Sequence, residues 1–293
     1  MEMRQLEYFV AVAEEANFTR AAAKVHVAQP GVSAQIRQLE RELGEELLDR
    51  SSRTVRLTKV GAAVLPYARA VLASADGARQ AVDELTGLVR GHVAVGMVTA
   101  CSAVELFDLL AGFRQRHPAL AITLTEGNSD GLIGGLLNGE LDLAWIGLGG
   151  APPAGLETQV VADEPLVAAV AHNNELAAKT NIALPELGGY PLISLPRGSG
   201  LRQALDEASA AARFQPHIAF EASSPAVVAQ LAARGLGVAI LPESSVGASS
   251  ELKALTISNP TLRARVELAW RAEGPITPAA RVLISEARSM LTR

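Results

Sequence analysis

Apolar residues in the first part of the chain recur at the spacing of an α-helix. The earliest stripe, which predicts a first helix, consists of Leu6, Phe9, Val10 and Ala13. Thr19 then suits the N-cap of a short alanine-rich helix, because its hydroxyl can accept a hydrogen bond from a first-turn N–H group. A third helix is predicted by apolar residues spaced four, three and four positions apart, namely Val32, Ile36, Leu39 and Leu43. Pro30 suits its start and Gly44 its end.

Two short helices joined by a tight turn predict a helix-turn-helix, and the polar face of the second helix is its informative part. Gln29, Ser33 and Arg37 project away from the apolar stripe near the helix start, where recognition helices reach base edges. Further along, residues 50–53 are Arg-Ser-Ser-Arg, and residues 54–57 alternate between polar and apolar side chains. This pattern predicts a small hairpin, or wing, with a basic tip.

Local charge, rather than total charge, points to nucleic acid. The 293-residue chain has a formal net charge of −5 and a pI near 5.6, which would not suggest a DNA-binding protein. However, residues 17–37 contain three basic side chains and residues 50–59 contain four, with no carboxylate in either segment. Phosphate contact requires such a local basic surface. The acids between these segments, which we expect to face away from DNA, are Glu40, Glu42, Glu45, Glu46 and Asp49. The alternative is an ordinary pair of helices with a solvated charged surface.

Residues 58–89 are predicted to form one long helix, capped at or near Thr58. Its apolar positions alternate in spacing between four and three residues, a heptad pattern formed by Val64, Ala68, Val71, Ala75, Ala78, Val82, Leu85 and Val89. We interpret this pattern as a seam that pairs with the same helix of a second subunit and holds two recognition helices at a fixed separation. The alternative is a single amphipathic helix that lies on its own domain.

Residues 90–293 follow a different pattern, in which apolar strands alternate with helical segments. Strands are expected at 92–97, 120–125, 141–147, 165–171, 191–195, 217–220, 236–241 and 266–270. Helices are expected at 101–116, 128–138, 200–213, 224–234 and 278–292. Such alternation predicts βαβ units around a parallel sheet.

Four motifs in the amino-terminal region resemble the signature of the LysR-type transcriptional regulators. They are Phe18…Ala21-Ala22, Gln29-Pro30…Val32-Ser33, Leu39-Glu40…Leu43-Gly44 and Arg50…Leu57-Thr58. Leu48 and Ala34 depart from the family pattern, which usually has phenylalanine and a longer polar residue there. A weaker resemblance continues to the carboxyl terminus. We therefore expect DNA contacts from Thr19, Arg20, Gln29, Pro30, Ser33, Arg37, Arg50 and Arg53.

The resemblance also implies an architecture and a set of partners. We expect an all-helical winged helix-turn-helix domain at 1–58, a linker and dimerisation helix at 59–89, and an α/β effector domain at 90–293 with the two lobes of a periplasmic-binding-protein fold. Lobe one would comprise 90–161 and 267–293, and lobe two 162–266, with crossing strands at 158–164 and 262–268. The expected partners are double-stranded DNA, a small anionic effector, other copies of the chain in a dimer and a tetramer, and RNA polymerase.

Turns between strands and helices supply the candidate effector site. Four candidates lie between the first strand and the first helix of lobe one, namely Thr99, Ala100, Cys101 and Ser102. Five more lie at later turns, namely Asn128, Ser129, Arg197, Ser199 and Ser223. Hydroxyls and free backbone N–H groups at helix starts suit an anion, and a guanidinium suits a carboxylate. The alternative for each serine, threonine or asparagine is a helix cap without a ligand.

An enzymatic function finds little support in the sequence. The five histidines lack metal-ligand spacing, no G-x-S-x-G motif is present, and we expect neither a metal nor a cofactor. Cys101 is the single cysteine, which excludes an intrachain disulfide and leaves a thiol-sensing regulator as an alternative. A constitutive DNA-binding protein with an inert second domain is another. The amino terminus lacks a secretion signal and no apolar run reaches about 18 residues, so we expect a cytoplasmic protein.

Overall fold

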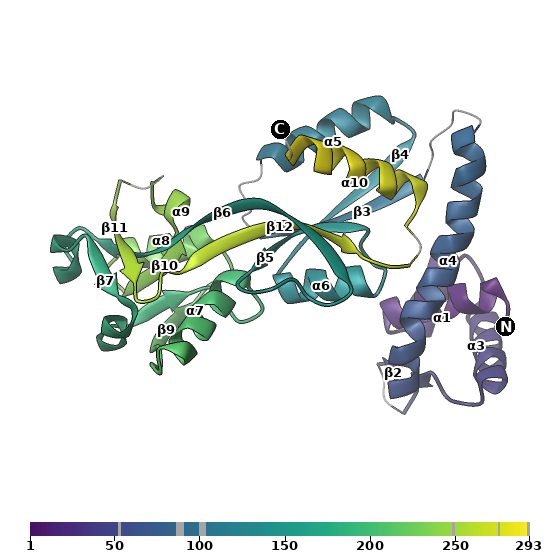
Figure 1. Cartoon of the computed structure of the whole chain (residues 1–293). Helices are drawn as coiled ribbons and strands as arrows, with labels where there is room; N and C mark the ends of the chain where they lie inside the picture. The colour runs from purple at the N-terminus through teal and green to yellow at the C-terminus, as the bar shows by residue number, and fades with distance from the viewer. Residues whose placement is uncertain (52–53, 86–90, 100–103, 248–249, 275, 292–293) are drawn as a thin grey trace.

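Figure 1 shows the computed structural model, which describes residues 1–51, 54–85, 91–99, 104–247, 250–274 and 276–291. A small helical domain at one end is followed by a long helix and then by an elongated α/β domain. Within the described ranges, no helix is both long enough and apolar enough to cross a membrane.

The amino-terminal domain contains the three helices and the hairpin that the sequence predicts. They are α1 (Met3–Glu15), α2 (Phe18–Lys24), α3 (Gln29–Leu43), β1 (Leu48–Asp49) and β2 (Arg56–Leu57). The apolar faces of the helices meet in one core, whose fully buried side chains include Phe9, Val12, Val32, Ile36 and Leu39. Leu43 was expected on the same stripe, but it is 41% exposed because it lies in the last turn of α3.

The start of α2 differs from the prediction, whereas the ends of α3 agree with it. Asn17, rather than Thr19, is the N-cap of α2: its Oδ1 accepts hydrogen bonds from the backbone N of Thr19 at 2.8 Å and of Arg20 at 3.0 Å. Thr19 lies inside the first turn. Pro30 lies in the first turn of α3, and Gly44 ends this helix with φ 81°, a left-handed conformation that glycine adopts without strain.

The long helix is α4 (Lys59–Leu85), and Thr58 caps it by accepting a hydrogen bond from the backbone N of Gly61 at 2.9 Å. Part of the predicted seam packs within the same chain, because Ala68 is buried in the amino-terminal core. Other seam positions, such as Val71, are exposed. Val89 lies outside the described residues. The first turns of α4 therefore lie on the chain's own domain, while exposed apolar positions remain on the same helix.

The rest of the chain forms two α/β lobes that share one sheet, with strand order β4-β3-β5-β12-β6-β10-β8-β9 (Figure 1). The parallel strands of lobe one are β3 (Gly91–Val98), β4 (Leu120–Gly127) and β5 (Leu143–Leu148). Two helices cover one face of this part of the sheet, α5 (Val104–Arg116) and α10 (Pro278–Leu291), and α6 (Ser129–Leu137) covers the other.

Lobe two repeats this arrangement with a second set of parallel strands. They are β8 (Leu192–Ser194), β9 (Ile218–Glu221) and β10 (Val238–Pro242), accompanied by the helices α7 (Gly200–Ala211) and α8 (Pro225–Ala233). The sequence did not predict the short elements at the edge of this lobe. These are η1 (Glu175–Ala178), β7 (Asn181–Ala183), η2 (Leu184–Gly189), α9 (Glu243–Gly247) and β11 (Leu252–Ser258).

Two antiparallel strands run through both lobes, β6 (Leu156–Ala171) and β12 (Arg263–Arg271). The sequence predicted a crossing at 158–164 and a separate strand at 165–171, but β6 is one strand of 16 residues. Its pattern changes midway because its first half is mostly exposed or half-buried, whereas Leu166–Ala171 is fully buried. A β-bulge shifts the pairing of β12 with β6 between Val266 and Glu267.

Candidate functional site

The polar face of α3 points away from the amino-terminal core. Gln29, Pro30 and Arg37 are exposed, and Ser33 is half-buried. The Nη2 atom of Arg37 donates a hydrogen bond to the Ser33 hydroxyl at 3.0 Å, so two predicted contact residues form one polar unit. Because the opposite face of the helix is buried, this face is held outward, in the geometry of a helix that can enter a major groove.

Two basic side chains at α2 have carboxylate partners that lie just outside residues 17–37, the segment without carboxylates. The Nε atom of Arg20 lies 3.3 Å from Glu15, and the Nζ atom of Lys24 lies 2.9 Å from Glu14. Hydrogen bonding to Glu14 raises the pKa of Lys24. Both glutamates belong to the end of α1, just before residue 17. The side chains of Arg20 and Lys24 remain 64% and 52% exposed, so a phosphate can still reach them.

Arg50 is held by groups inside its own domain. Its Nη2 atom lies 2.5 Å from Oε2 of Glu40, and its guanidinium lies 5.5 Å from the centre of the Phe18 ring. The other carboxylate oxygen of Glu40 accepts hydrogen bonds from the backbone N atoms of Leu47 and Leu48. Glu40, one of the acids expected to face away from DNA, is therefore buried and fixes the chain between α3 and the hairpin. Arg53 lies outside the described residues.

A cavity of about 550 Å³ lies between the two lobes. Five of the predicted effector residues line it, namely Thr99, Asn128, Ser129, Ser199 and Ser223. Ala100, Cys101 and Ser102 lie outside the described residues. Three further polar residues line the cavity that the sequence did not single out, Glu164, Ser244 and Ser245. The two serines follow a predicted strand, which is a signal that could have found them, whereas Glu164 lies within a crossing strand.

Several polar atoms of the lining already have partners in the fold. The Oδ1 atom of Asn128 accepts a hydrogen bond from the backbone N of Gly131 at 2.9 Å and caps α6. The Ser199 hydroxyl caps α7 and donates to the Pro196 carbonyl at 2.7 Å. The Ser129 hydroxyl accepts from the backbone N of Gly147 at 3.0 Å. The cap alternative therefore applies to Asn128 and Ser199, although each retains further hydrogen-bonding capacity.

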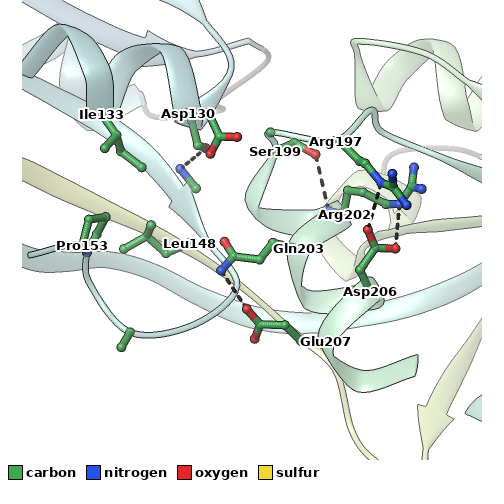
Figure 2. Close-up of a pocket in the computed structure, with 14 residues that line it drawn as sticks. Asp130, Ile133, Leu148, Pro153, Arg197, Ser199, Arg202, Gln203, Asp206 and Glu207 are labelled. Carbon is green, nitrogen blue, oxygen red and sulfur yellow. Dashed lines mark hydrogen bonds and ion pairs between the residues drawn. The ribbon is translucent and has the colours of Figure 1, made fainter. Parts of the chain in front are cut away.

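Arg197 lies outside this cavity, in a second hollow of about 410 Å³ (Figure 2). Its side chain is 82% exposed, and its Nε atom lies 3.6 Å from Oδ2 of Asp206. Figure 2 shows Arg202 of α7 reaching the same carboxylate, with its Nε atom 2.9 Å from Oδ1. In the structure the guanidinium of Arg197 therefore has a carboxylate partner in its own lobe, and its contact with a ligand carboxylate stays a prediction.

The two lobes touch through their backbones beside both hollows. The backbone N of Asp130 in lobe one donates a hydrogen bond to the carbonyl of Gly198 in lobe two at 3.1 Å. A Cβ atom added to Gly200 would lie 2.5 Å from the carbonyl oxygen of Gly147, a distance that no larger residue can accept without a shift of the backbone. The amino end of α7 therefore rests directly on the end of β5.

A buried arginine connects the effector domain to the amino-terminal domain. Arg69 lies on α4, and its Nη1 atom is 2.6 Å from Oε1 of Glu140, in the turn after α6. Its Nη2 atom is 3.2 Å from Oε1 of Glu14, on α1. Because Glu14 also pairs with Lys24, a continuous chain of charged groups runs from lobe one to α2.

Both parts of the chain match known family models. Residues 3–62 match the bacterial regulatory helix-turn-helix protein of the lysR family, and residues 86–292 match the LysR substrate binding domain. The chain is 32% identical to the HTH-type transcriptional regulator BudR of Raoultella terrigena over 277 residues, which are 92% of this chain and 95% of BudR. It is also 32% identical to the uncharacterized HTH-type transcriptional regulator YnfL of Escherichia coli over 285 residues, 96% of each chain.

Solved structures agree with these matches. A full-length OxyR variant from Pseudomonas aeruginosa is 29% identical, with a TM-score of 0.76 and coverage of 99% of this chain and 94% of that one. CbnR, a LysR family transcriptional regulator, is 27% identical, with a TM-score of 0.62 and coverage of 99% of each chain. The chain therefore belongs to the LysR family of transcriptional regulators: it is not an enzyme, and it joins a helix-turn-helix DNA-binding domain to a two-lobed domain for small-molecule effectors.

Proposed function

We propose that the chain is a cytoplasmic regulator that binds a specific double-stranded DNA site as a homodimer and changes this binding when a small anionic metabolite occupies the cavity between the lobes. The observation that carries the proposal is the Arg69 connection, because it gives the effector domain and the DNA-binding domain of one chain a shared group of charges. We divide the chain accordingly into a DNA-binding domain at 1–58, a linker helix at 59–89 and an effector domain at 90–293.

In the proposed DNA complex, the first turns of α3 enter the major groove, where Gln29, Ser33 and Arg37 contact base edges and Pro30 lies against the sugar-phosphate backbone. Thr19 and Arg20 at α2 contact phosphates, as does Arg53, which the sequence predicts at the tip of the wing. Arg50 supports this surface from below, since its guanidinium is held by Glu40 and packs on Phe18. The structure of full-length CbnR in complex with its target DNA, at 27% identity and a TM-score of 0.61, offers a fold-level precedent for such docking.

Dimerisation is assigned to α4. Tyr67 and Val71 of this helix are 75% and 42% exposed, and such large exposed side chains on one helix suit a partner surface. Two dimers would form a tetramer through their effector domains, and RNA polymerase would be the partner through which bound regulator acts on transcription. Small-angle scattering of the full chain would contradict this assembly if it gave the mass of a monomer at micromolar concentration.

The anionic effector is supported by the helix starts that meet at the cavity. Asn128 and Ser199 mark the amino ends of α6 and α7, and Thr99 precedes α5. Free N–H groups and the helix dipole favour a negative group at such positions. Among the described residues that line the cavity there is no lysine, arginine or histidine, so these groups rather than a cationic side chain would bind the anion.

The proposed coupling runs along α6. One end of this helix lines the cavity with Ser129, and the turn after its other end places Glu140 against Arg69. A rigid helix of nine residues can transmit a small shift of the cavity wall to the linker helix. The coupling must be supplied by a difference in effector affinity between two arrangements of the lobes.

The test combines DNA selection with one variant. The preferred duplex is first selected from a randomised pool, and its affinity for the full chain is measured by fluorescence anisotropy with and without compounds that raise the melting temperature. Typical coupling changes affinity by roughly 5- to 150-fold. We expect Glu140→Gln to keep effector binding and DNA binding but to lose most of this factor.

The matched control is Glu186→Gln, which breaks the exposed ion pair with Lys179 in lobe two. It should leave the effector response unchanged. An equal loss of response in both variants would contradict the role of Arg69. A wild-type chain that selects no duplex sequence from the pool would contradict the proposed function itself.

A further inference from the structure

One carboxylate stands out in the lining of the cavity between the lobes. Glu164 of β6 is the single charged side chain among the described residues that line this cavity. The other polar groups of that described lining are hydroxyls and one amide. Because an ionised carboxylate is a strong acceptor and cannot donate, it imposes a chemical requirement on whatever fills the space in front of it.

The orientation of Glu164 is fixed by the first residues of α9. Its Oε2 atom accepts a hydrogen bond from the backbone N of Ser244 at 2.9 Å, and its Oε1 atom accepts one from the Ser244 hydroxyl at 2.8 Å. A carboxylate has about four lone-pair sites on its two oxygens. Two of them are therefore used within the fold, and acceptor capacity remains on both oxygens.

The neighbouring cations are bound by other carboxylates. On the paired strand β12, Arg263 lies 2.6 Å from Asp163, and Arg265 pairs with Glu267. In the part of the chain that the structure describes, no basic side chain forms an ion pair with Glu164. The charge that faces the cavity is thus not neutralised from within the protein.

The residues around Glu164 are small on the side of the cavity. Alternate residues of a strand face the same side, and Ala162 and Glu164 of β6 line the cavity together with Ala264 and Val266 of β12. Val161, at the β-bulge, lines it as well. Ala264 is the direct cross-strand partner of Glu164. A methyl group at that position does not cover the carboxylate, and a ligand group can approach it.

We propose that Glu164 pairs with a positively charged nitrogen of the effector, so that the effector class is an anionic metabolite that also carries an ammonium group, such as an amino acid. This inference rests on the proposed function, which places an anionic group of the same ligand at the starts of α6 and α7. The ammonium supplies the counter-charge that Glu164 lacks and donates to its free lone pairs. Carboxylates of the same shape without the nitrogen leave Glu164 unpaired and bind more weakly.

The first experiment compares matched ligands on the full-length chain. The amino acids are screened by thermal shift, each beside its desamino carboxylate and its 2-hydroxy analogue, and the affinities of the compounds that bind are measured by titration calorimetry. We expect at least one amino acid to bind roughly tenfold or more tightly than its desamino partner, the scale of a hydrogen bond between charged groups. The inference is overturned if the desamino carboxylates bind as well, or if no amino acid raises the melting temperature.

The second experiment is Glu164→Gln, which removes the charge but keeps an amide oxygen that can accept from the backbone N of Ser244. Its urea midpoint should match that of the parent, which separates loss of charge from misfolding. The preference for the amino acid over its desamino partner should fall to near unity. A variant that keeps the full preference would show that Glu164 only caps α9 and would overturn the inference.

A control variant and the measured DNA affinity separate this inference from the proposed function. Glu207→Gln, in the second hollow, should leave ligand affinity unchanged, because Glu207 lines that hollow and not the cavity between the lobes. If an amino acid binds through Glu164 but does not change DNA affinity, the inference stands and the regulatory function fails. If carboxylates without nitrogen bind and change DNA affinity, the function stands and the role of Glu164 fails.

Discussion

The polar face of α3 and the cavity between the lobes are built in opposite ways. The face is made by one helix, whose residues are close in sequence and share a solvent-exposed side. The cavity is made by strand ends and helix starts that are distant in sequence, from Val98 to Val266. A contiguous surface depends on local helix geometry, whereas an assembled cavity depends on how the whole domain packs. The two regions should therefore fail for different reasons when they are altered.

Charge is also organised differently in the two regions. Around α2 and the hairpin, arginine and lysine side chains are paired with carboxylates of the same domain but remain partly exposed, so phosphates can compete for them. In the described lining of the cavity a lone carboxylate faces hydroxyls. At the DNA-binding surface, a phosphate can replace a carboxylate as the partner of a basic side chain. In the cavity, the carboxylate has no cationic partner in the protein, so it favours a ligand that brings one.

The largest expected effect is at the contact between the lobes. A Cβ atom on residue 200 would lie 2.3 Å from the carbonyl carbon of Gly147, so Gly200→Ala must push the lobes apart. We expect a loss of about 3 kcal/mol or more in the free energy of unfolding, measured by urea unfolding, together with weakened effector binding. Gly134→Ala, in α6, is the control, because an added Cβ atom there meets nothing within 4 Å. Equal stability of the two variants would contradict the contact.

Replacing Arg50 should lower the stability of the fold more than it changes the preference for a DNA sequence. In Arg50→Ala the buried Glu40 carboxylate loses its charged partner, which should lower the free energy of unfolding by about 2 to 3 kcal/mol. Adding Glu40→Gln should restore part of the loss, since glutamine can still accept from the backbone of Leu47. Arg56→Ala, in the exposed strand of the same hairpin, should leave the urea midpoint nearly unchanged. If the Arg50→Ala variant were stable but had an altered base preference, Arg50 would contact DNA and not mainly stabilise the domain.

Replacing Gln29 should change the preference for a DNA sequence and leave the stability of the fold unchanged. Its side chain is exposed at the start of α3, so Gln29→Ala should leave the melting temperature unchanged. We expect it to relax preference at one base pair by about 1 to 2 kcal/mol, as a lost side-chain contact to a base edge does. Selection from randomised duplexes measures this directly. Gln35→Ala, an exposed glutamine on the same helix, should leave base preference intact, and an identical shift in both variants would argue against the docking.

The smallest expected effect is on the pH dependence of stability, and one group in each domain should respond, at opposite ends of the pH scale. Burial raises the pKa of Asp142 in lobe one, so the folded chain holds this proton more tightly than the unfolded chain. Its contribution to stability therefore falls as the pH rises above about 3.8, the ordinary value, through the raised folded pKa. Asp142→Asn should flatten this slope in urea unfolding between pH 4 and 7. If the free energy of unfolding of Asp142→Asn had the same slope against pH as the parent, Asp142 would not be the group responsible.

Lys24 gives the opposite case near α2. Its pKa is raised by Glu14, so its contribution is present below 10.5 and is lost as the pH rises through the folded pKa. Lys24→Met should remove this alkaline loss, and because the side chain is half exposed the change should be small. Unfolding curves between pH 9 and 11 measure it, and a larger loss in Lys24→Met than in the parent over that range would contradict the pairing.

The contrast between the regions also explains what the sequence could predict. The boundaries of α3 followed from Pro30, Gly44 and the buried stripe, because helix starts, ends and faces are set within a few residues. The cap of α2 was misplaced by two residues, since Asn17 and Thr19 both carry an oxygen suited to the role. The partners of Arg20 and Arg50 were missed because Glu15 and Glu40 reach them only after the helices pack.

In the effector domain, the order of strands and helices was largely predicted, but three of the polar residues that line the cavity were not. The positions of Asn128 and Ser199 in the cavity lining could be predicted because strand ends gather at one edge of a parallel sheet. Glu164 could not, because nothing in an extended polar segment shows which side of β6 will face a cavity or that Ser244 will hold the carboxylate. The pairing of Arg197 with Asp206 was not predicted either, because Arg197 lies in the turn before α7 and Asp206 within that helix, and the two meet only in the folded lobe.

The glycine contact between the lobes sets the direction in which the effector domain can move. Peptide groups of Gly147 and Gly200 already meet with no side chain between them, so the lobes have no further room to approach each other on that side. The remaining freedom is to separate or to rotate about this point as a pivot. Any ligand that reshapes the domain must therefore rotate the lobes about this contact or separate them there, because the contact limits their approach on that side.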